Sequence, residues 1–469
     1  MRGTSRIVAL LSSFVLLVAG CGSRLPDDER AEAVSALTGG GSGQVTGTGD
    51  SAETTDTSTG DETGDGETTG GGTDVGGTTD TGGGGAAGGP ALATCTKATK
   101  ATDTGATASK LTVATLADIS GVQPGLFQSA HQAARAAGAY INSVSGICGR
   151  EIEVKPLDSK TDSGGNRFAM LDACDSAFAV VGSMSAFDDG SAAPGQSCGI
   201  PDITAITTNR SKYNATNTFP AYPNSGPKIS TTSARYIAKR YPDVIKKAGI
   251  VWLNQAVTKN NAVARERAWK TAGFNFVYRQ EVQVLEANYT RFVIDMQNRG
   301  VQYVTMVSDY QNIHRLQKSM KQQNYVPKVR DWDSVAYDAD YLKEAEAVEG
   351  SLVFINTAMV EESGTEMSLY KQWLQRASPG AVPDFFGVYA WSAYRLFQKL
   401  ATQIGPDLTR EKMLAALKAT KEWNGNGIHG PHQTGAKLPT VCNLYMQVKG
   451  GKFTRLAPAS GFDCSGGLA

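Results

Sequence analysis

The stretch from Lys110 to Asp158 limits the possible folds most, because it reads as a strand, a loop, a helix and a second strand. Lys110–Leu116 is a short run rich in β-branched residues, and Glu151–Asp158 reads as another strand. Between them, apolar residues recur at helical spacing: Ala130, Ala133, Ala134, Ala137, Tyr140 and Ile141. Two parallel strands joined by a helix form a βαβ unit, so the sequence predicts an α/β fold.

The same alternation continues toward the C-terminus. Further strands are expected at Ala177–Val181, Asp202–Ile206, Ala248–Trp252, Val301–Val307 and Gly350–Ile355. Helices are expected at Asn260–Thr271, Tyr289–Arg299, Gln311–Gln323 and Phe385–Gln403. About 350 residues of such alternation exceed what one core supports, so we expect two lobes, each a doubly wound parallel sheet. Turn residues gather at Tyr222–Pro227, which places the seam there.

The first residues have the pattern of a targeting segment. Arg2 and Arg6 precede an apolar run, Ile7–Val18, which is too short to span a bilayer as a mature helix. The run leads into Leu-Val-Ala-Gly-Cys, ending at Cys21, and this motif resembles a bacterial lipobox. The resemblance implies a signal peptide over residues 1–20, a lipidated Cys21 and a protein held at the outer face of the cell membrane. An ordinary secretion signal with a stray cysteine is the alternative.

A low-complexity tract follows the mature N-terminus, which we place at residues 21–38. Residues 39–92 are mainly Gly, Thr, Ser, Ala and Asp, with acidic but no basic side chains. Such a composition buries too little apolar surface to fold, so the tract is expected to be a disordered tether. The whole chain carries 45 basic and 45 acidic residues. No basic excess therefore favours nucleic acid or an anionic membrane surface as a partner.

Cysteine usage indicates disulfides. The chain has seven cysteines, and six remain when Cys21 is set aside. An even number in an exported protein favours disulfide bonds, and the sequence does not choose among the 15 possible pairings. Proximity along the chain favours Cys174–Cys198 and Cys442–Cys464, which leaves Cys95–Cys148. No CxxC occurs and the histidines lie apart from the cysteines, so no metal site is expected. No P-loop lysine pattern is present either, and no cofactor is expected.

Several stretches together carry a family resemblance. They are Thr115–Gly121, Ala179–Ser185, Gly199–Asn209, Lys247–Asn254 and the tail Trp423–Phe453. In this order they resemble the type I periplasmic binding proteins of the Leu/Ile/Val-binding branch. The resemblance implies a monomer that captures a small polar ligand, an amino acid or related metabolite, between two lobes. It also implies delivery of the ligand to the permease subunits of an ABC importer.

The family's hinge with chain crossovers implies that each lobe is discontinuous. By this resemblance, residues 109–226 and about 357–424 form the first lobe. Residues 227–356 and about 425–469 form the second lobe. The ligand is then expected beyond the carboxyl ends of the strands, where the two lobes face each other.

Residues of the expected ligand site in the first lobe follow three strands. They are Asp118 after the first strand; Ser183, Ser185 and Phe187 after the third; and Thr207, Thr208 and Asn209 after the fourth. Exposed N–H groups at a helix start favour an anion, so Ser183 and Ser185 suit a ligand carboxylate. The resemblance implies that these loops hold the carboxylate and amino ends of an amino acid.

Candidates from the second lobe also follow strands. They are Asn254, Asp309 and Tyr310, and Trp332 and Asp333 after a short strand expected at Val326–Val329. An acid here suits a ligand ammonium group, and the aromatic rings could cover the ligand. The loop from Asn254 to Thr258 lacks the tyrosine typical of branched-chain amino acid binders, and Asp333 matches the family's acid only approximately. The identity of the ligand is therefore left open.

Each of these residues also has a purely structural interpretation. Ser183 and Ser185 suit helix caps, as does Asp118. The hydroxyls of Thr207 and Thr208 suit hydrogen bonds to loop backbone. Tyr310 and Trp332 suit a core or a lobe interface. What favours a site is that all of them fall at strand ends expected to share one edge.

Catalytic motifs are absent in their required context. Gly195–Gly199 fits G-x-S-x-G, but Pro194 precedes it and a strand follows it, so Ser197 is not at a nucleophile elbow. His429 and His432 flank a turn with no neighbouring acid or cysteine. We therefore expect a receptor and not an enzyme. A sensor that hands its closed shape to a signalling partner, or a non-binding surface scaffold, remains as an alternative.

Overall fold

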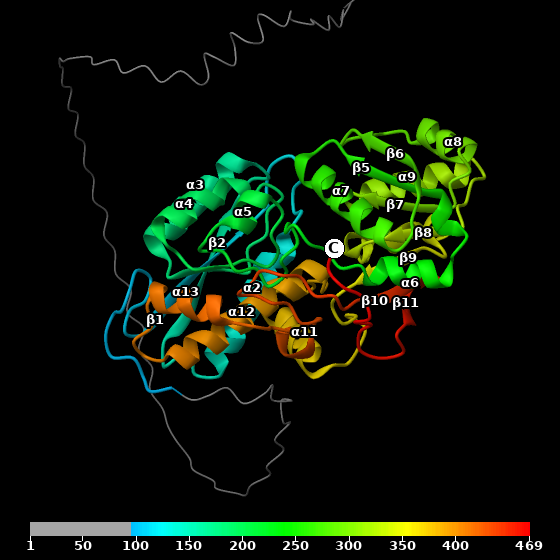
Figure 1. Cartoon of the computed structure of the whole chain (residues 1–469). Helices are drawn as coiled ribbons and strands as arrows, with labels where there is room; N and C mark the ends of the chain where they lie inside the picture. The colour runs from blue at the N-terminus through cyan, green and yellow to red at the C-terminus, as the bar shows by residue number, and fades with distance from the viewer. Residues whose placement is uncertain (1–94) are drawn as a thin grey trace, which may run out of the picture. The chain divides into compact units, whose positions relative to one another are not determined.

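The computed structural model describes residues 95–469 (Figure 1). The expected signal peptide, the lipidation site at Cys21 and the tether over residues 39–92 lie outside the described residues. Within them, strands and helices alternate along the chain as the sequence predicts, and the strands form two separate sheets.

The first sheet has the strand order β2-β1-β3-β4, and all its neighbours are parallel. Its strands are β1 (Lys110–Ala117), β2 (Glu151–Asp158), β3 (Ala179–Val181) and β4 (Asp202–Ile203). All four were predicted, although β4 is shorter than expected. Beyond Ile203 the chain leaves the sheet, because Ala205 bonds instead to the backbone of Ser183 and Tyr222.

Two helices cover opposite faces of this sheet. Helix α2 (Gln128–Ser143) packs with Leu111 and Val113 of β1, while α3 (Ser163–Ser176) packs with Ala114 and Leu116. Alternate residues of one strand therefore serve the two faces. The predicted apolar stripe of α2 is confirmed, because all six of its members are buried.

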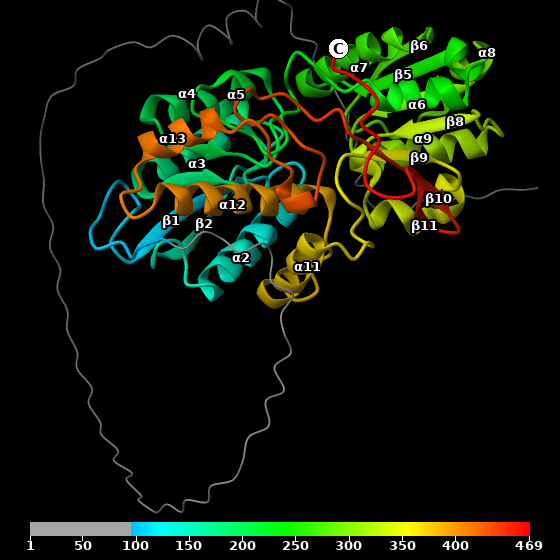
Figure 2. The same cartoon turned by 60° about the horizontal axis from the view of Figure 1, so that its bottom comes forward.

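Five further helices lie on the side of the first sheet, three of them from a distant part of the chain. They are α4 (Asp189–Cys198), α5 (Arg210–Asn214), α11 (Thr365–Ala377), α12 (Phe385–Ile404) and α13 (Arg410–Ala419). Figure 2 shows α12 beside α2 and the first sheet, although more than 200 residues separate the two helices. Arg395 of α12 forms a buried ion pair with Glu366 of α11, with Nε 2.7 Å from Oε1, and so fixes these helices together.

The second sheet has the order β11-β10-β9-β8-β7-β5-β6. Its strands are β5 (Ala248–Leu253), β6 (Phe276–Val282), β7 (Tyr303–Val307), β8 (Val329–Trp332), β9 (Leu352–Ile355), β10 (Leu444–Lys449) and β11 (Lys452–Ala457). The sheet is parallel from β6 to β9, but β10 and β11 are antiparallel additions at its edge. Strand β6 is one that the sequence analysis missed.

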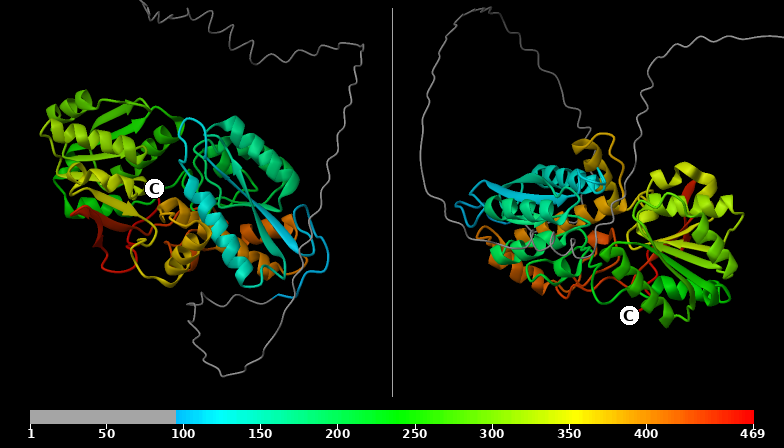
Figure 3. Two further views of the ribbon diagram at one scale, coloured as in Figure 1. Left: turned by 180° about the vertical axis from the view of Figure 1, so that it is seen from behind. Right: turned by 90° about the horizontal axis from the view of Figure 1, so that it is seen from above.

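Helices lie on both faces of the second sheet (Figure 3). They are α6 (Thr232–Arg240) and α7 (Ala256–Thr271) on one face, and α8 (Thr290–Asn298) and α9 (Tyr310–Gln322) on the other. Tyr303 and Val307 of β7 pack toward α6 and α7, whereas Val304 and Met306 pack toward α8 and α9. The short helices are η1 (Val244–Lys247), η2 (Ser334–Ala336), η3 (Asp340–Glu344), α10 (Ala345–Val348) and η4 (Gly425–Gly427).

The chain passes between the two sheets three times, and one tyrosine of α12 contacts all three connections. The Tyr389 hydroxyl donates to Oδ1 of Asn356 in the second connection, at 2.9 Å. It also lies 2.9 Å from Nε2 of His432 in the third. The ring of Tyr389 stacks on Tyr222 of the first connection, with centroids 5.0 Å apart.

The six cysteines of the described residues form three disulfides: Cys95–Cys148, Cys174–Cys198 and Cys442–Cys464. The pairing favoured by proximity is confirmed. Within residues 95–469, none of the helices has both the length and the apolar character needed to cross a bilayer.

Candidate functional site

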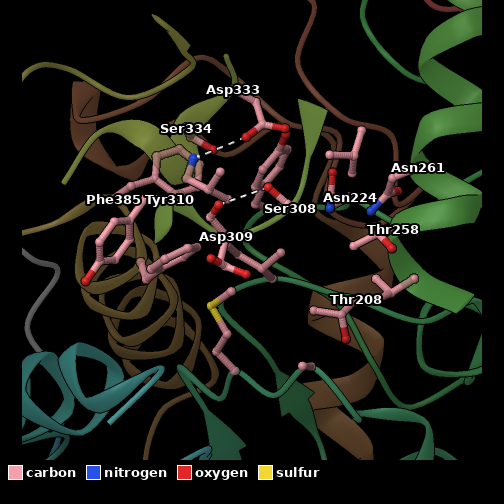
Figure 4. Close-up of a pocket in the computed structure, with 18 of the residues that line it drawn as sticks. Thr208, Asn224, Thr258, Asn261, Ser308, Asp309, Tyr310, Asp333, Ser334 and Phe385 are labelled. Atoms are coloured by element: carbon pink, nitrogen blue, oxygen red, sulfur yellow. Dashed lines mark hydrogen bonds between the residues drawn. The ribbon is translucent and has the colours of Figure 1, made fainter. Parts of the chain in front are cut away.

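A cavity of about 670 Å³ is lined by loops that follow strands of both sheets (Figure 4). The first lobe contributes Phe127, Ser129, Met184, Ala186, Ile206 and Thr208, together with Asp384, Phe385 and Phe386 at the start of α12. The second lobe contributes Thr258, Asn261, Arg265, Ser308, Asp309, Tyr310, Asp333, Ser334, Asp338 and Asp340. Tyr222 and Asn224 of the first connection also line it.

The position follows from the topology of parallel sheets, whose carboxyl strand ends share one edge. Among the ligand contacts predicted from the sequence, Thr208, Asp309, Tyr310 and Asp333 reach the cavity wall. The others lie outside it: Asp118, Ser183, Ser185, Phe187, Thr207, Asn209, Asn254 and Trp332.

Asp118 is completely buried behind the first-lobe loops. Its carboxylate accepts hydrogen bonds from the hydroxyls of Ser159 and Ser185, at 2.5 and 2.8 Å, and from the Ala186 N–H at 2.8 Å. Burial raises the pKa of Asp118 above its usual range. Asp118 therefore joins the loops after β1, β2 and β3, and its oxygens do not face the cavity.

Asp188 has the same role for the loop after β4. Its carboxylate accepts the backbone N–H groups of Thr208 and Asn209 at 2.7 and 2.9 Å, and the Asn209 side-chain amide at 2.9 Å. Burial raises the pKa of Asp188 to about 6. Asp188 directly precedes α4, but its side chain does not cap that helix and instead accepts the donors of the neighbouring loop.

The other first-lobe candidates are held by backbone groups or lie apart from the cavity. The Ser183 hydroxyl accepts from the Leu116 N–H at 2.8 Å. Thr207 is completely buried, and its hydroxyl has no hydrogen-bond partner among the described residues. Phe187 is half-buried, and its N–H donates to the Ser185 hydroxyl. Among the predicted first-lobe residues, only Thr208 reaches the cavity, and its hydroxyl donates to the Ser185 carbonyl.

In the second lobe, Asp309 and Tyr310 begin helix α9 at the cavity wall. Asp309 is the N-cap, and its carboxylate accepts both the N–H and the side-chain amide of Asn312, at 2.9 and 2.8 Å. The Tyr310 hydroxyl lies 3.4 Å from Oδ2 of Asp340. The carboxylate that was expected to hold a ligand ammonium group thus also stabilises a helix start.

Asp333 forms an ion pair with Arg265 at the cavity wall. Nη2 of Arg265, on α7, forms an ion pair with Asp333, and Nη1 donates to the Thr305 hydroxyl at 2.9 Å. The guanidinium lies over the rings of Trp269 and Phe354, 5.7 and 5.6 Å from their centroids. Arg265 carries no helix-cap or motif signal in the sequence, so the sequence analysis missed this pair.

The prediction that Trp332 follows a strand is wrong, because Trp332 is the last residue of β8 itself. The strand begins at Val329 and not at Val326, since Pro327 has no N–H for the sheet ladder. Trp332 is completely buried in the core, so its ring does not cover the cavity. Asn254 is exposed, and its neighbour Gln255 lines the cavity instead.

Three acids at the cavity were not predicted: Asp338, Asp340 and Asp384. Asp384 is the N-cap of α12, accepting the Gly387 N–H at 2.6 Å, and burial raises its pKa to about 6. Asp338 follows β8 in the other lobe, and burial raises its pKa too. A cap signal was present, because Asp384 stands directly before the predicted helix at Phe385.

Residues that fit catalytic motifs occupy structural positions. Ser197 lies exposed within α4, not at a turn between strand and helix. His429 and His432 are buried with ring centroids 5.0 Å apart, and His429 Nε2 lies 2.7 Å from the Ser392 hydroxyl. In residues 95–469, no group of three or more His, Cys, Asp or Glu side chains is arranged to hold a metal ion.

Residues 110–452 match the profile of a family described as periplasmic binding protein. The chain belongs to the periplasmic binding protein family. Members of this family are extracytoplasmic solute-binding receptors, so this periplasmic binding protein acts outside the cytoplasm and is not an enzyme. Its fold is the type I periplasmic binding protein fold that the sequence analysis expected.

Solved structures of periplasmic binding proteins share this fold at low sequence identity. A fatty acid ABC transporter substrate-binding protein from Thermomonospora curvata has a TM-score of 0.66 at 15% identity, over 78% of this chain and 95% of that one. The branched-chain amino acid transporter substrate-binding protein LivJ from Streptococcus pneumoniae, in complex with isoleucine, gives 0.62 at 13% identity, over 75% and 100%. The leucine-binding protein LivK from Thermotoga maritima gives 0.61 at 15%, over 74% and 98%. No curated protein sequence gives a significant match.

Proposed function

We propose that this protein captures a small polar organic solute, an amino acid or a related metabolite, and delivers it to an ABC importer. The observation that carries the proposal is the cavity of about 670 Å³, whose wall is built from both lobes. A ligand that fills such a cavity contacts both lobes at once. It therefore stabilises the closed arrangement over an open one, which is how a solute-binding receptor signals occupancy to a permease.

The proposed lobes are residues 109–226 with about 357–424, and residues 227–356 with about 425–469. The sheet order supports this division, because β1 to β4 form one sheet and β5 to β11 form the other. The three connections between the sheets are then the hinge, and Tyr389 contacts each of them.

The proposed ligand contacts are those predicted residues that reach the cavity: Thr208, Asp309, Tyr310 and Asp333. The buried candidates Asp118, Ser183 and Ser185 hold the first-lobe loops in shape, and Thr207 is buried beside them. Phe187, Asn209, Asn254 and Trp332 have no cavity contact, and we propose no ligand contact for them in this arrangement.

The proposed setting is the outer face of the cell membrane. A lipid on Cys21 anchors the protein as a monomer, and the tether over residues 39–92 lets the folded part reach a permease. A Cys21→Ala variant is expected in the soluble extracellular or periplasmic fraction, whereas the wild-type protein is expected with membranes. A wild-type protein that is fully soluble after export contradicts the anchor.

A thermal-shift screen tests ligand binding. Amino acids, amides, short peptides and small aromatic acids are added to the purified mature protein, and a ligand at 100 times its Kd adds about 2.7 kcal/mol of stability. A non-binding scaffold gives no shift with any compound. Uptake of the identified ligand is then measured in cells lacking the gene. Loss of uptake is expected if the protein delivers the ligand to an importer, whereas unchanged uptake indicates a sensor.

A further inference from the structure

In the first lobe, four donors of the loops after β3 and β4 are already occupied by the chain itself. Asp188 accepts the N–H groups of Thr208 and Asn209, and Asp118 accepts the Ala186 N–H and the Ser185 hydroxyl. Both acids are buried. An incoming carboxylate therefore finds these groups taken and meets two carboxyl groups directly behind them.

Two helix starts at the cavity are occupied in the same way, whereas α2 and α7 begin there without a side-chain cap. Asp309 caps α9 and Asp384 caps α12, each accepting a backbone N–H of its own first turn. A free helix start attracts an anion, but a start capped by a carboxylate does not. The N-termini of α9 and α12 therefore offer no anion site to a ligand.

The side chains of the cavity wall carry an excess of negative charge. Its acids are Asp309, Asp333, Asp338, Asp340 and Asp384, and Arg265 is the basic side chain of the wall. Arg265 is used by Asp333, and Asp340 pairs with Lys343 at 2.8 Å. Asp309, Asp338 and Asp384 form no ion pair with a described residue.

Aromatic rings and a buried hydroxyl lie beside these acids. Phe385 and Phe386 directly follow Asp384, and Phe386 packs edge-on against Phe127 with centroids 5.2 Å apart. Ser129, on α2, lines the cavity, is only 8% exposed and lies beside Asp384. An aromatic wall next to carboxylates suits an organic cation.

We propose that the ligand is an organic amine without a free carboxylate, whose ammonium group lies between Asp384 of the first lobe and Asp338 of the second. The proposal rests on the proposed receptor function and narrows its ligand class. An ammonium group at this place neutralises both carboxylates and bonds to both lobes. Without it, the like charges of Asp338 and Asp384 oppose closure of the cavity.

Two matched sets of probes test the charge preference by isothermal titration calorimetry of the mature protein. One set is 2-phenylethylamine, L-phenylalanine and 3-phenylpropionate, and the other is 3-methylbutylamine, L-leucine and 4-methylpentanoate. Within at least one set, the amine is expected to bind at least tenfold more tightly than the zwitterion, and the carboxylate not to bind. Tighter binding of an amino acid or carboxylate overturns the proposal but leaves the receptor function standing. Failure of all six compounds overturns the proposal as well, and the wider thermal-shift screen then decides the receptor function separately.

Substitutions of Asp384 and Asp338 test whether these two acids cause the preference for an amine. Asp384→Asn keeps a side chain that caps helices well, and is expected to weaken amine binding about tenfold. The double variant with Asp338→Asn is expected to lose about a hundredfold. Asp243→Asn, a matched charge removal at an exposed residue outside the cavity, is expected to change nothing. Equal amine affinity in the wild type and the Asp338/Asp384 double variant overturns the proposal.

Discussion

The ring of Tyr222 stacks on the ring of Tyr389 at a centroid distance of 5.0 Å and an interplanar angle of 20°. One backbone contact determines which atom donates in each hydrogen bond around Tyr389. The Thr440 N–H donates to Nδ1 of His432, so Nε2 of His432 carries the proton and donates to the tyrosine oxygen. The tyrosine hydroxyl can then donate to Asn356. All three connections between the sheets are thereby joined at one residue.

Tyr389→Phe is expected to lower the free energy of unfolding by about 2 kcal/mol, because the buried His432 and Asn356 both lose a partner. Tyr370→Phe is a matched control, since the Tyr370 hydroxyl is equally buried but has no hydrogen-bond partner among the described residues. Denaturant unfolding measures both. Equal stability losses in the two variants contradict the role of the Tyr389 hydroxyl.

Asp333→Asn is expected to lower the stability of the ligand-free protein by about 2–3 kcal/mol, because it leaves the buried guanidinium of Arg265 without its counter-ion. Thr207→Val is the control at a first-lobe position. The Thr207 hydroxyl is buried without a partner among the described residues, so its replacement by a methyl group is expected to be neutral or slightly stabilising. A melting temperature of Asp333→Asn equal to that of the wild type excludes a structural role for the ion pair.

Amine binding is expected to weaken about tenfold between pH 7 and pH 5, since a pKa of about 6 leaves Asp384 largely protonated at the lower pH. The groups facing Asp384 are Asp338, Ser129 and Tyr370, and none of them carries a positive charge. For the folding stability of the ligand-free protein, a lower pH has the opposite effect and is favourable. The folded-state pKa lies above the ordinary value of 3.8, so the stability contributed by neutral Asp384 is present below pH 3.8 and lost as the pH rises through about 6.

The variant Asp384→Asn separates this titration from those of other groups. Its amine affinity is expected to be lower than that of the wild type at pH 7 and to change little between pH 7 and pH 5. Calorimetry at several pH values gives the comparison. A wild-type pH profile that persists unchanged in the variant assigns the titration to another group.

Loss of the Cys95–Cys148 disulfide is expected to cost about 4 kcal/mol, and loss of Cys442–Cys464 about 3 kcal/mol, because the first closes the longer loop. The sequence separations are 53 and 22 residues. Paired Cys→Ala variants followed by thermal unfolding test the order. The reverse order indicates that loop entropy is not the main contribution.

Much of the fold follows from local sequence pattern. The β-branched run at Lys110 and the alanine stripe after it predict β1 and α2, because burial on a sheet requires that periodicity. The exception at β8 also has a local cause, since the effect of Pro327 on the sheet ladder was overlooked. Strand ends then predict where a cavity lies, and Thr208 and Asp309 are found there.

The chemistry of the cavity depends on tertiary contacts that no local pattern reveals. The sequence shows Ser185 and Thr208 as available polar groups, but it does not show that Asp118 and Asp188 already accept hydrogen bonds from these loops. Likewise, Arg265 reaches Asp333 from a helix 68 residues earlier in the chain. Which donors stay free for a ligand is decided by such pairings.

Asp188 also decides whether the loop after β4 keeps its shape. Its carboxylate fills the place beside the Thr208 and Asn209 N–H groups. Shortening that one side chain to glycine removes the acceptor of both amides and leaves two donors unsatisfied. A single carboxylate, placed after β3, therefore tethers the neighbouring loop to its own.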